Sequence, residues 1–218
     1  MEKLILDIVL WAVPVVLAIT LHEAAHGYVA RMFGDPTAHL MGRITLNPLK
    51  HIDPVGTLLI PGGIVLMNAM TGASFPPFGW AKPVPVDFGR LRKPKADMLW
   101  VAVAGPATNL LQAIVWAVLI GFLIRMQGSP DLFWFDLAKR GMLVNVGLML
   151  INLVPIPPLD GGRIAVSLLP MRQAIAWSRI EPYGFYILIG LLYFGVLDYV
   201  LQYVARPILQ FLMLFTGV

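Results

Sequence analysis

An uncharged run in the chain extends from Met98 to Ile124 and contains 27 residues. A helix needs about 20 apolar residues to cross the hydrocarbon core of a bilayer, so this run is long enough to span it. Two other runs approach that length: Leu4 to Leu21, interrupted only by Asp7, and the 19 uncharged residues from Gly141 to Leu159. Runs of this kind favour transmembrane helices, because a helix satisfies its backbone hydrogen bonds internally.

Composition agrees with an integral membrane protein. Of 218 residues, 58% are apolar and only 13% are charged, whereas soluble domains carry about 25% charged residues. Two shorter apolar runs, Pro182 to Leu197 and Pro207 to Val218, are separated by Asp198 and Arg206. We count two spans there, because both charges would lie too deep within a single long helix. The predicted fold is an all-α polytopic membrane protein, a bundle of about five or six transmembrane helices.

Several classes of protein are excluded by residue content. The chain has no cysteine, which excludes disulfides, thiolate metal sites and a cysteine nucleophile. The net charge of +4 is explained by topology, and no basic and aromatic stripe suited to nucleic acid is present. We interpret the first apolar run as a retained helix, because it lacks an Ala-x-Ala cleavage site of the signal-peptide type.

Basic residues gather in three clusters, which the positive-inside rule places in the cytoplasm. These clusters are Arg31, Arg43 and Lys50; Lys82, Arg90, Arg92, Lys93 and Lys95; and Arg163, Arg172 and Arg179. The first helix is therefore expected to run from the outside to the inside of the membrane.

We predict a single transmembrane core domain over residues 1–218. Its parts are a first helix (1–33), a re-entrant or extended section (34–95), a second secure span (96–126), a third helix (136–162) and C-terminal helices (182–218). The section 34–95 is expected to form a short membrane-associated β or re-entrant structure. We interpret 54–71 as re-entrant or as a paired helix and loop, because a full span would move the following basic cluster outside.

The sequence "LHEAAH" near the end of the first run carries the chemistry. On a helix, His22 and His26 project about 40° apart with about 6 Å of rise, which suits two imidazoles on one metal ion. Glu23 is offset from them, so its carboxylate can take a proton from a water molecule at the metal instead of binding the metal. A chance match is the alternative, but buried ionisable groups in a spanning helix are costly without partners.

Such a site needs a third protein ligand. Asp160 is the best candidate, because three prolines break the helix just before it and Gly161 and Gly162 allow the backbone to turn tightly around it. A helix-capping role for Asp160 is the alternative interpretation. Asp198 is a second candidate ligand, on a weaker span.

Three motifs together resemble the site-2 protease family of intramembrane zinc metalloproteases. They are "HEAAH" in the first span, "AGPATN" from Ala104 to Asn109 and "NLVPIPPLDG" from Asn152 to Gly161, spread over about 140 residues. The flanking sequences "GRITLNPLKHIDPVGT" and "FGWAKPV" resemble a compact bacterial or archaeal branch without PDZ or CBS domains. A multi-pass protein of the plasma membrane, with its active site toward the cytoplasm, is what the resemblance and the charge pattern imply.

The resemblance implies that His22, His26 and Asp160 hold one zinc ion per chain and that Glu23 is the general base. It also implies that Asn152 polarises or orients the substrate carbonyl, against the alternative of a helix-helix hydrogen bond. We expect "GPATN" to serve close helix packing, with Asn109 contacting the active-site region. His51 could touch the site from the loop, but we expect it at the surface or the membrane interface.

The predicted function is hydrolysis of peptide bonds within or near transmembrane segments, with the zinc-bound water activated by Glu23. Expected partners are the lipid bilayer, single-span membrane proteins or peptides as substrates, and a separate adaptor protein if the membrane core does not select substrates alone. Extended segments between Gly42 and Asp87 could pair with an unwound substrate. The alternative is a non-proteolytic protein on the same fold, either a zinc carrier or an inactive scaffold.

Overall fold

The computed structural model describes residues 2–72, 79–127 and 132–217, and every regular element within these ranges is helical. In chain order the elements are α1 (Glu2–Met32), α2 (Thr37–Leu40), η1 (Pro48–Lys50), η2 (Pro54–Leu59), α3 (Ile60–Thr71), η3 (Phe88–Arg90), α4 (Pro94–Gln127), α5 (Leu132–Asn152), α6 (Asp160–Leu168), α7 (Met171–Ser178), α8 (Glu181–Tyr193) and α9 (Val196–Met213). The all-helical part of the predicted fold is confirmed.

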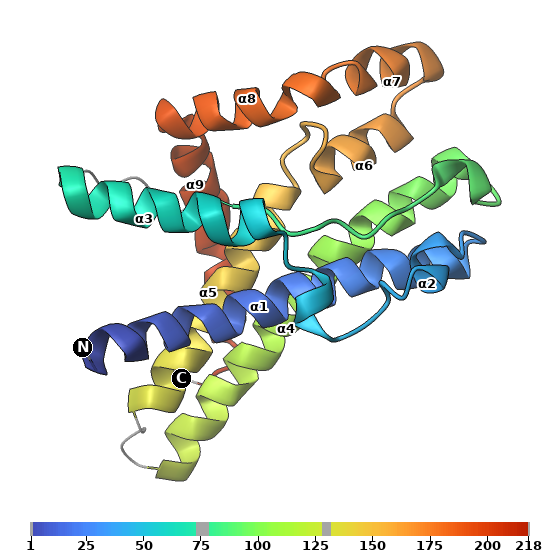
Figure 1. Cartoon of the computed structure of the whole chain (residues 1–218). Helices are drawn as coiled ribbons and strands as arrows, with labels where there is room; N and C mark the ends of the chain where they lie inside the picture. Colours follow the sequence, from blue (N-terminus) through green and yellow to red (C-terminus); the bar gives the residue numbers. More distant parts are fainter. Residues whose placement is uncertain (1, 73–78, 128–131, 218) are drawn as a thin grey trace.

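Helices α1, α4 and α5 pack on one another and form the centre of the molecule (Figure 1). Small residues of α4 allow close approach to α5, and α9 closes the other side of this core. Its fully or nearly buried members are Ala113, Ala117, Ile120 and Leu123 of α4, Ala138, Met142, Val146, Met149 and Leu150 of α5, and Leu212 of α9. This packing sets the relative positions of the helices that carry the three motifs.

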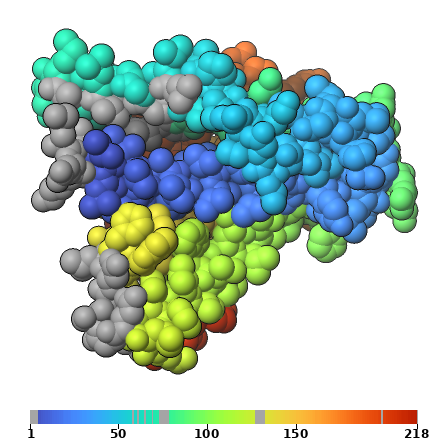
Figure 2. All heavy atoms as spheres, turned by 60° about the horizontal axis from the view of Figure 1, so that its bottom comes forward, coloured from blue at the N-terminus to red at the C-terminus, as the bar shows by residue number. Residues whose placement is uncertain are grey.

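The two longest apolar helices agree with a membrane location. Ile5–Met32 of α1 and Pro94–Met126 of α4 are the segments, within the described ranges, that are both long and apolar enough to cross a bilayer. Figure 2 shows α1 lying open along one face of the molecule. Large apolar side chains such as Ile5 and Ile8 are more than half exposed there, as expected for a surface that faces lipid tails. Two spans are fewer than the five or six that the sequence predicts.

Helices α5 and α8 differ from long uncharged spans, because α5 contains charged residues and α8 is short. Helix α5 carries Asp136, Lys139 and Arg140 in its first half, and α8 has 13 residues, which gives a length of about 20 Å. Arg140 forms an ion pair with Asp7, in which Nη2 of Arg140 lies 2.6 Å from Oδ1 of Asp7. That ion pair joins the beginning of α1 to α5, which explains why the first apolar run tolerates Asp7.

The prediction of β structure between the first two spans is wrong for the residues described. Residues 54–71 form the π-helical turn η2 and helix α3, and 79–87 is extended without pairing to another strand. Two prolines, Pro83 and Pro85, have no backbone N–H to donate. The side chains of Glu23 and Arg43 bind other backbone groups of the segment. A re-entrant path for α3, which has 12 residues, stays a prediction.

The helix break before Asp160 forms where the prolines predict it. Helix α5 ends at Asn152 and α6 begins at Asp160. The two glycines after Asp160 act differently from our expectation, because neither has a positive φ. They provide space instead: a Cβ on Gly161 would lie 2.3 Å from the Leu153 carbonyl oxygen, and one on Gly162 would lie 2.2 Å from the Pro157 nitrogen.

Asp35 joins the end of α1 to the extended segment that returns beside it. Its carboxylate accepts hydrogen bonds from the amide and the hydroxyl of Thr37 and from the amide of Asp87. Burial alone would raise the pKa of Asp35, but these hydrogen bonds favour the charged form and hold the pKa below its ordinary value. The ionised carboxylate therefore stabilises this junction.

We expect Asp35→Asn to lower the free energy of unfolding by about 1 to 3 kcal/mol at neutral pH, because a charged acceptor with three donors is lost. A lowered folded-state pKa contributes stability above the unfolded value of about 3.9, and that stability disappears as the pH falls through the folded pKa. Melting temperatures of both proteins in detergent should differ at pH 7 and converge as the pH falls below about 4. An equal difference at all pH values would contradict this assignment.

Candidate metal centre

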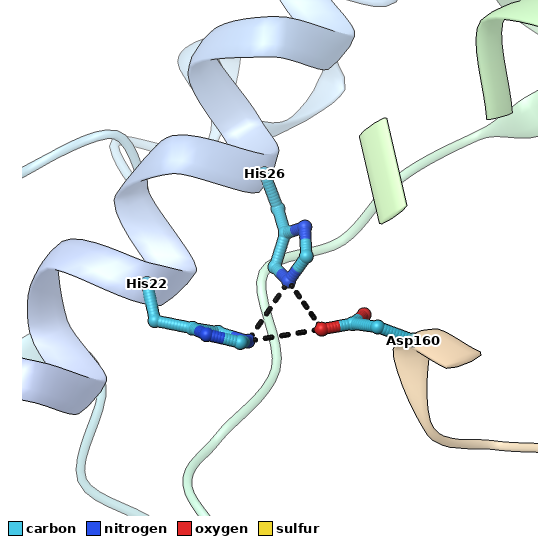
Figure 3. Close-up of side chains that lie close together, drawn as sticks. All are labelled: His22, His26 and Asp160. Atoms are coloured by element: carbon cyan, nitrogen blue, oxygen red, sulfur yellow. Dashed lines mark hydrogen bonds and ion pairs between the residues drawn. The ribbon is translucent and has the colours of Figure 1, made fainter. Parts of the chain in front are cut away.

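Three side chains from two elements meet in the interior of the bundle (Figure 3). His22 and His26 project from one face of α1, and Asp160 reaches them from the first turn of α6. Their Nε2 atoms lie 3.0 Å apart, and Oδ2 of Asp160 lies 3.2 Å from Nε2 of His22 and 3.3 Å from Nε2 of His26. All three residues are buried. The structure thus brings together the three residues that the sequence nominated.

The size of this triangle fits a small metal ion. Tetrahedral zinc binds imidazole nitrogen and carboxylate oxygen at about 2.0 to 2.2 Å, which separates neighbouring ligand atoms by about 3.3 Å. The observed separations of 3.0 to 3.3 Å are close to that value. A tetrahedral ion held on these three atoms keeps a fourth position for another ligand, which is the arrangement of catalytic zinc sites.

Hydrogen bonds behind the two imidazoles determine which nitrogens face the centre. Nδ1 of His26 lies 2.7 Å from the Val101 carbonyl oxygen, which can only accept, so Nδ1 carries the hydrogen. Nδ1 of His22 lies 2.6 Å from Oδ1 of Asn109. The amide group of Asn109 donates through Nδ2 to Oδ1 of Asn145, so Asn109 Oδ1 is the acceptor for His22. In the neutral rings both Nε2 atoms therefore present lone pairs.

Three electron-pair donors thus point at one another in a buried site. Oδ2 of Asp160 is a buried oxygen with no hydrogen-bond donor among the described residues. Two imidazole lone pairs and a carboxylate at this distance repel one another unless a cation lies between them. The donor set, its spacing and the unsatisfied oxygen together fit a divalent metal ion better than a purely structural cluster.

Helix α4 lies directly against both histidine rings through the "GPATN" motif. A Cβ on Gly105 would lie 2.5 Å from Cε1 of His22 and 2.5 Å from Nε2 of His26. Only glycine leaves room for both rings at this point. Asn109, one turn further along, is fully buried and orients His22, as outer-shell residues of metal sites commonly do. The expectation that Asn109 contacts the active-site region is confirmed.

Glu23 lies beside the cluster without joining it. Its Oε2 accepts a hydrogen bond of 2.7 Å from the Val84 amide in the extended segment 79–87. The carboxylate is partly buried and is separate from the three convergent ligand atoms. This arrangement is consistent with a carboxylate that handles protons.

Three other predicted positions have different surroundings. Asn152 donates from Nδ2 to the Leu148 carbonyl oxygen of its own helix, at 3.0 Å, so its substrate role stays a prediction. His51 is 2% exposed and its Nε2 lies 3.0 Å from the Thr45 carbonyl oxygen, so the expected surface position is wrong. Asp198 belongs to α9, and its side chain lies outside the described residues.

Sequence reasoning missed Asn145 and Val84. Asn145 is fully buried and holds the amide of Asn109, while its own Nδ2 donates to the Gly141 carbonyl oxygen. An asparagine in the middle of the uncharged run from Gly141 to Leu159 was a usable signal, because polar groups at membrane depth are costly unless they have hydrogen-bond partners. Val84 acts through its backbone, which no side-chain pattern reveals.

Comparison with known proteins identifies the family. The model of Peptidase family M50 matches residues 10–128 and 127–195, most of the chain. The chain belongs to peptidase family M50. This is the site-2 protease family, so the resemblance inferred from the three motifs is confirmed, and the protein is a zinc-dependent metalloprotease. The M50 match covers α1 from residue 10 onward, α4, α5 and all of α6, and these elements hold every residue of the cluster.

Similar curated proteins carry matching names. "Putative zinc metalloprotease YwhC" of Bacillus subtilis is 37% identical over 194 residues, which cover 87% of this chain and 82% of that protein. "Putative zinc metalloprotease Rip2" of Mycolicibacterium smegmatis is 36% identical, over 81% of this chain and 63% of that protein. "Zinc metalloprotease MJ0392" of Methanocaldococcus jannaschii is 26% identical, over 75% of this chain and 36% of that protein. No solved structure matches the M50 protease described here.

The close contact between Gly105 of α4 and the two histidine rings predicts that a methyl group added at this position strongly weakens zinc binding. We expect Gly105→Ala to lower zinc affinity by about 10- to 100-fold, the range found when groups surrounding metal ligands are changed, because the new Cβ displaces His22 or His26. Zinc bound by detergent-purified protein, measured by elemental analysis at limiting free zinc, tests this.

Gly147→Ala is the matched control, since a Cβ on Gly147 meets nothing within 4 Å and α5 gains the same helix propensity. Unchanged zinc affinity in Gly105→Ala, with the control behaving as the wild type, would contradict the proposed contact.

Proposed function

We propose that this M50 protease is a multi-pass intramembrane enzyme that hydrolyses peptide bonds within or near transmembrane segments of membrane proteins. His22, His26 and Asp160 hold the zinc ion, and Glu23 is the general base. One observation carries the proposal: a buried triangle of zinc-type ligand atoms includes two histidines from a helix long and apolar enough to cross the membrane.

The depth of the site explains the class of substrate. His26 lies six residues before the end of α1 at Met32, a distance of about 9 Å along the helix. The flanking basic cluster at Arg31, Arg43 and Lys50 supports a cytoplasmic position for that end of α1. A substrate bond would therefore be cut close to the cytoplasmic face of the membrane, where water can reach the protein interior.

The chain's residues divide the reaction between binding and proton transfer. Bound zinc supplies a Lewis acid that acidifies a water molecule and polarises a peptide carbonyl. Glu23 accepts a proton as the water oxygen bonds to the carbonyl carbon. It then returns that proton to the leaving nitrogen as the carbon–nitrogen bond breaks. Asn109 and the Val101 carbonyl keep both imidazoles in one tautomer throughout.

Asn152 is proposed to contact the substrate carbonyl. Its amide uses one hydrogen on Leu148, and a side-chain amide has a second hydrogen and an acceptor oxygen. It lies at the end of α5, directly before the loop that leads to Asp160. This position supports the role that the family resemblance implies.

A division of labour between Glu23 and the ligands follows. Glu23→Gln should keep stoichiometric zinc and lose cleavage by at least about 100-fold, because general-base catalysis contributes about 10² to 10⁴ in rate. Purified protein is incubated with single-span membrane peptides, and cleavage and zinc content are measured together, with and without a chelator. Loss of zinc in Glu23→Gln would make Glu23 a ligand. Chelator-insensitive cleavage, or zinc transport into proteoliposomes, would contradict the proposed protease.

The third ligand is tested by two aspartates. Asp160→Ala should lose most of its zinc and all measurable cleavage, because it removes the oxygen that faces both Nε2 atoms. Asp198→Ala should keep both properties. Zinc content and peptide cleavage of the two variants in detergent decide the matter, and the reverse pattern would overturn the proposed ligand set.

A further inference from the structure

The extended segment beside Glu23 presents a single backbone donor to it. Val84 lies between Pro83 and Pro85, neither of which has an N–H group. Across these three residues the Val84 amide is thus the one backbone donor, and it points to Oε2 of Glu23 at 2.7 Å. A residue that precedes proline favours extended backbone, so both prolines help to hold the conformation in which this amide faces α1.

The same segment is attached to the protein immediately before Val84. Arg43 Nη2 donates to the carbonyl oxygens of Lys82 at 2.8 Å and Pro83 at 3.2 Å, and the Lys82 amide donates to the His51 carbonyl oxygen at 2.9 Å. Arg43 is 7% exposed. Burial of a guanidinium costs free energy unless hydrogen bonds compensate for the lost water. The two hydrogen bonds from buried Arg43 therefore fix the position of this segment.

Side-chain packing fixes the segment along α1 as well. The Val84 side chain is 6% exposed and rests on Gly27, where an added Cβ would lie 3.0 Å from Val84 Cγ1. Gly27 and Glu23 are one helical turn apart, so they share a face of α1. The valine side chain and the valine amide thus contact neighbouring points on the helix that carries the active-site motif.

These bonds leave little of the segment for a substrate strand. The amides of Lys82 and Val84 and the carbonyls of Lys82 and Pro83 are already engaged. Pairing of a substrate with Lys82–Val84, which the extended pattern had suggested, would first require these bonds to break. A support that stays in place agrees better with this set of contacts than a strand that receives substrate.

We infer that Pro83-Val84-Pro85, held by Arg43, is a fixed positioning element for Glu23. The Val84 amide holds one carboxylate oxygen, restricts rotation of the side chain and leaves the other oxygen to exchange protons with the reacting water. Val84 and Arg43 are positioning residues, since they act through Glu23. The inference rests on the proposed role of Glu23 as general base.

The test replaces one backbone N–H group by an oxygen atom and retains the side chain. Replacing Val84 by 2-hydroxyisovaleric acid, through nonsense suppression in the full-length chain, changes the amide to an ester without N–H. We expect kcat for a membrane-peptide substrate to fall by about tenfold or more, the effect of losing a hydrogen bond to a charged group, with KM and zinc content unchanged. The same replacement at Val86, whose amide makes no hydrogen bond within the described part of the chain, should leave kcat unchanged.

A second measurement does not depend on activity. Val84 carries the one exchangeable backbone amide among residues 83–85, so the difference between overlapping proteolytic fragments that end on either side of these three residues reports on its hydrogen exchange. Exchange there should be faster by about tenfold or more in Glu23→Ala and in Arg43→Gln. Arg43→Lys keeps a cationic donor and should restore part of both the protection and the kcat lost in Arg43→Gln.

The outcomes separate the two proposals. If the ester at Val84 has wild-type kcat while Glu23→Gln is inactive, the positioning role is wrong and the proposed function stands. Loss of zinc or a changed KM in the ester protein would also overturn the inference, because the segment would then shape the metal site or bind substrate. Full activity of Glu23→Gln would overturn the proposed function itself.

Discussion

Mutual repulsion of three buried lone-pair donors is the constraint on which this structure depends. The two Nε2 atoms and Oδ2 of Asp160 lie within 3.3 Å of one another, a spacing that a cation between them makes favourable. To reach it, α6 must begin where it does, α4 must approach both histidine rings with a glycine, and α1 must carry both rings on one face. The geometry of the His22, His26 and Asp160 cluster therefore depends on the packing of the helix bundle.

The polar groups of the bundle interior follow from the same constraint. In a low-dielectric interior each imidazole needs a partner for its second nitrogen, and α4 supplies both through Asn109 and the Val101 carbonyl. Asn145 of α5 then satisfies Asn109, and the Gly141 carbonyl satisfies Asn145. This chain of hydrogen bonds links the three central helices, so orientation of the ligands and helix packing support each other.

The section between α1 and α4 has a different role from the one that its sequence pattern suggests. Alternating apolar residues and prolines over 82–86 look like a strand available for pairing. In the folded protein Arg43, His51 and Glu23 take up its backbone groups, so the segment functions as part of the wall of the site. Asp35 anchors the end of the same segment to α1 through the Asp87 amide. One cation, Arg43, and two carboxylates, Glu23 and Asp35, thus hold this short extended segment, although all three are distant from it in the sequence.

The sequence alone determined the elements with strong local signals. Long apolar runs predict α1 and α4, prolines predict the break before Asp160, and His-Glu-x-x-His places two imidazoles on one helical face. Each of these signals depends on residues that are near one another in the chain. Only the tertiary structure decided that Asn109 faces His22, that Gly105 makes room for two rings and that the Val84 amide meets Glu23. These contacts join residues 61 to 87 positions apart, and they depend on how the helices pack and on backbone groups that every residue type shares.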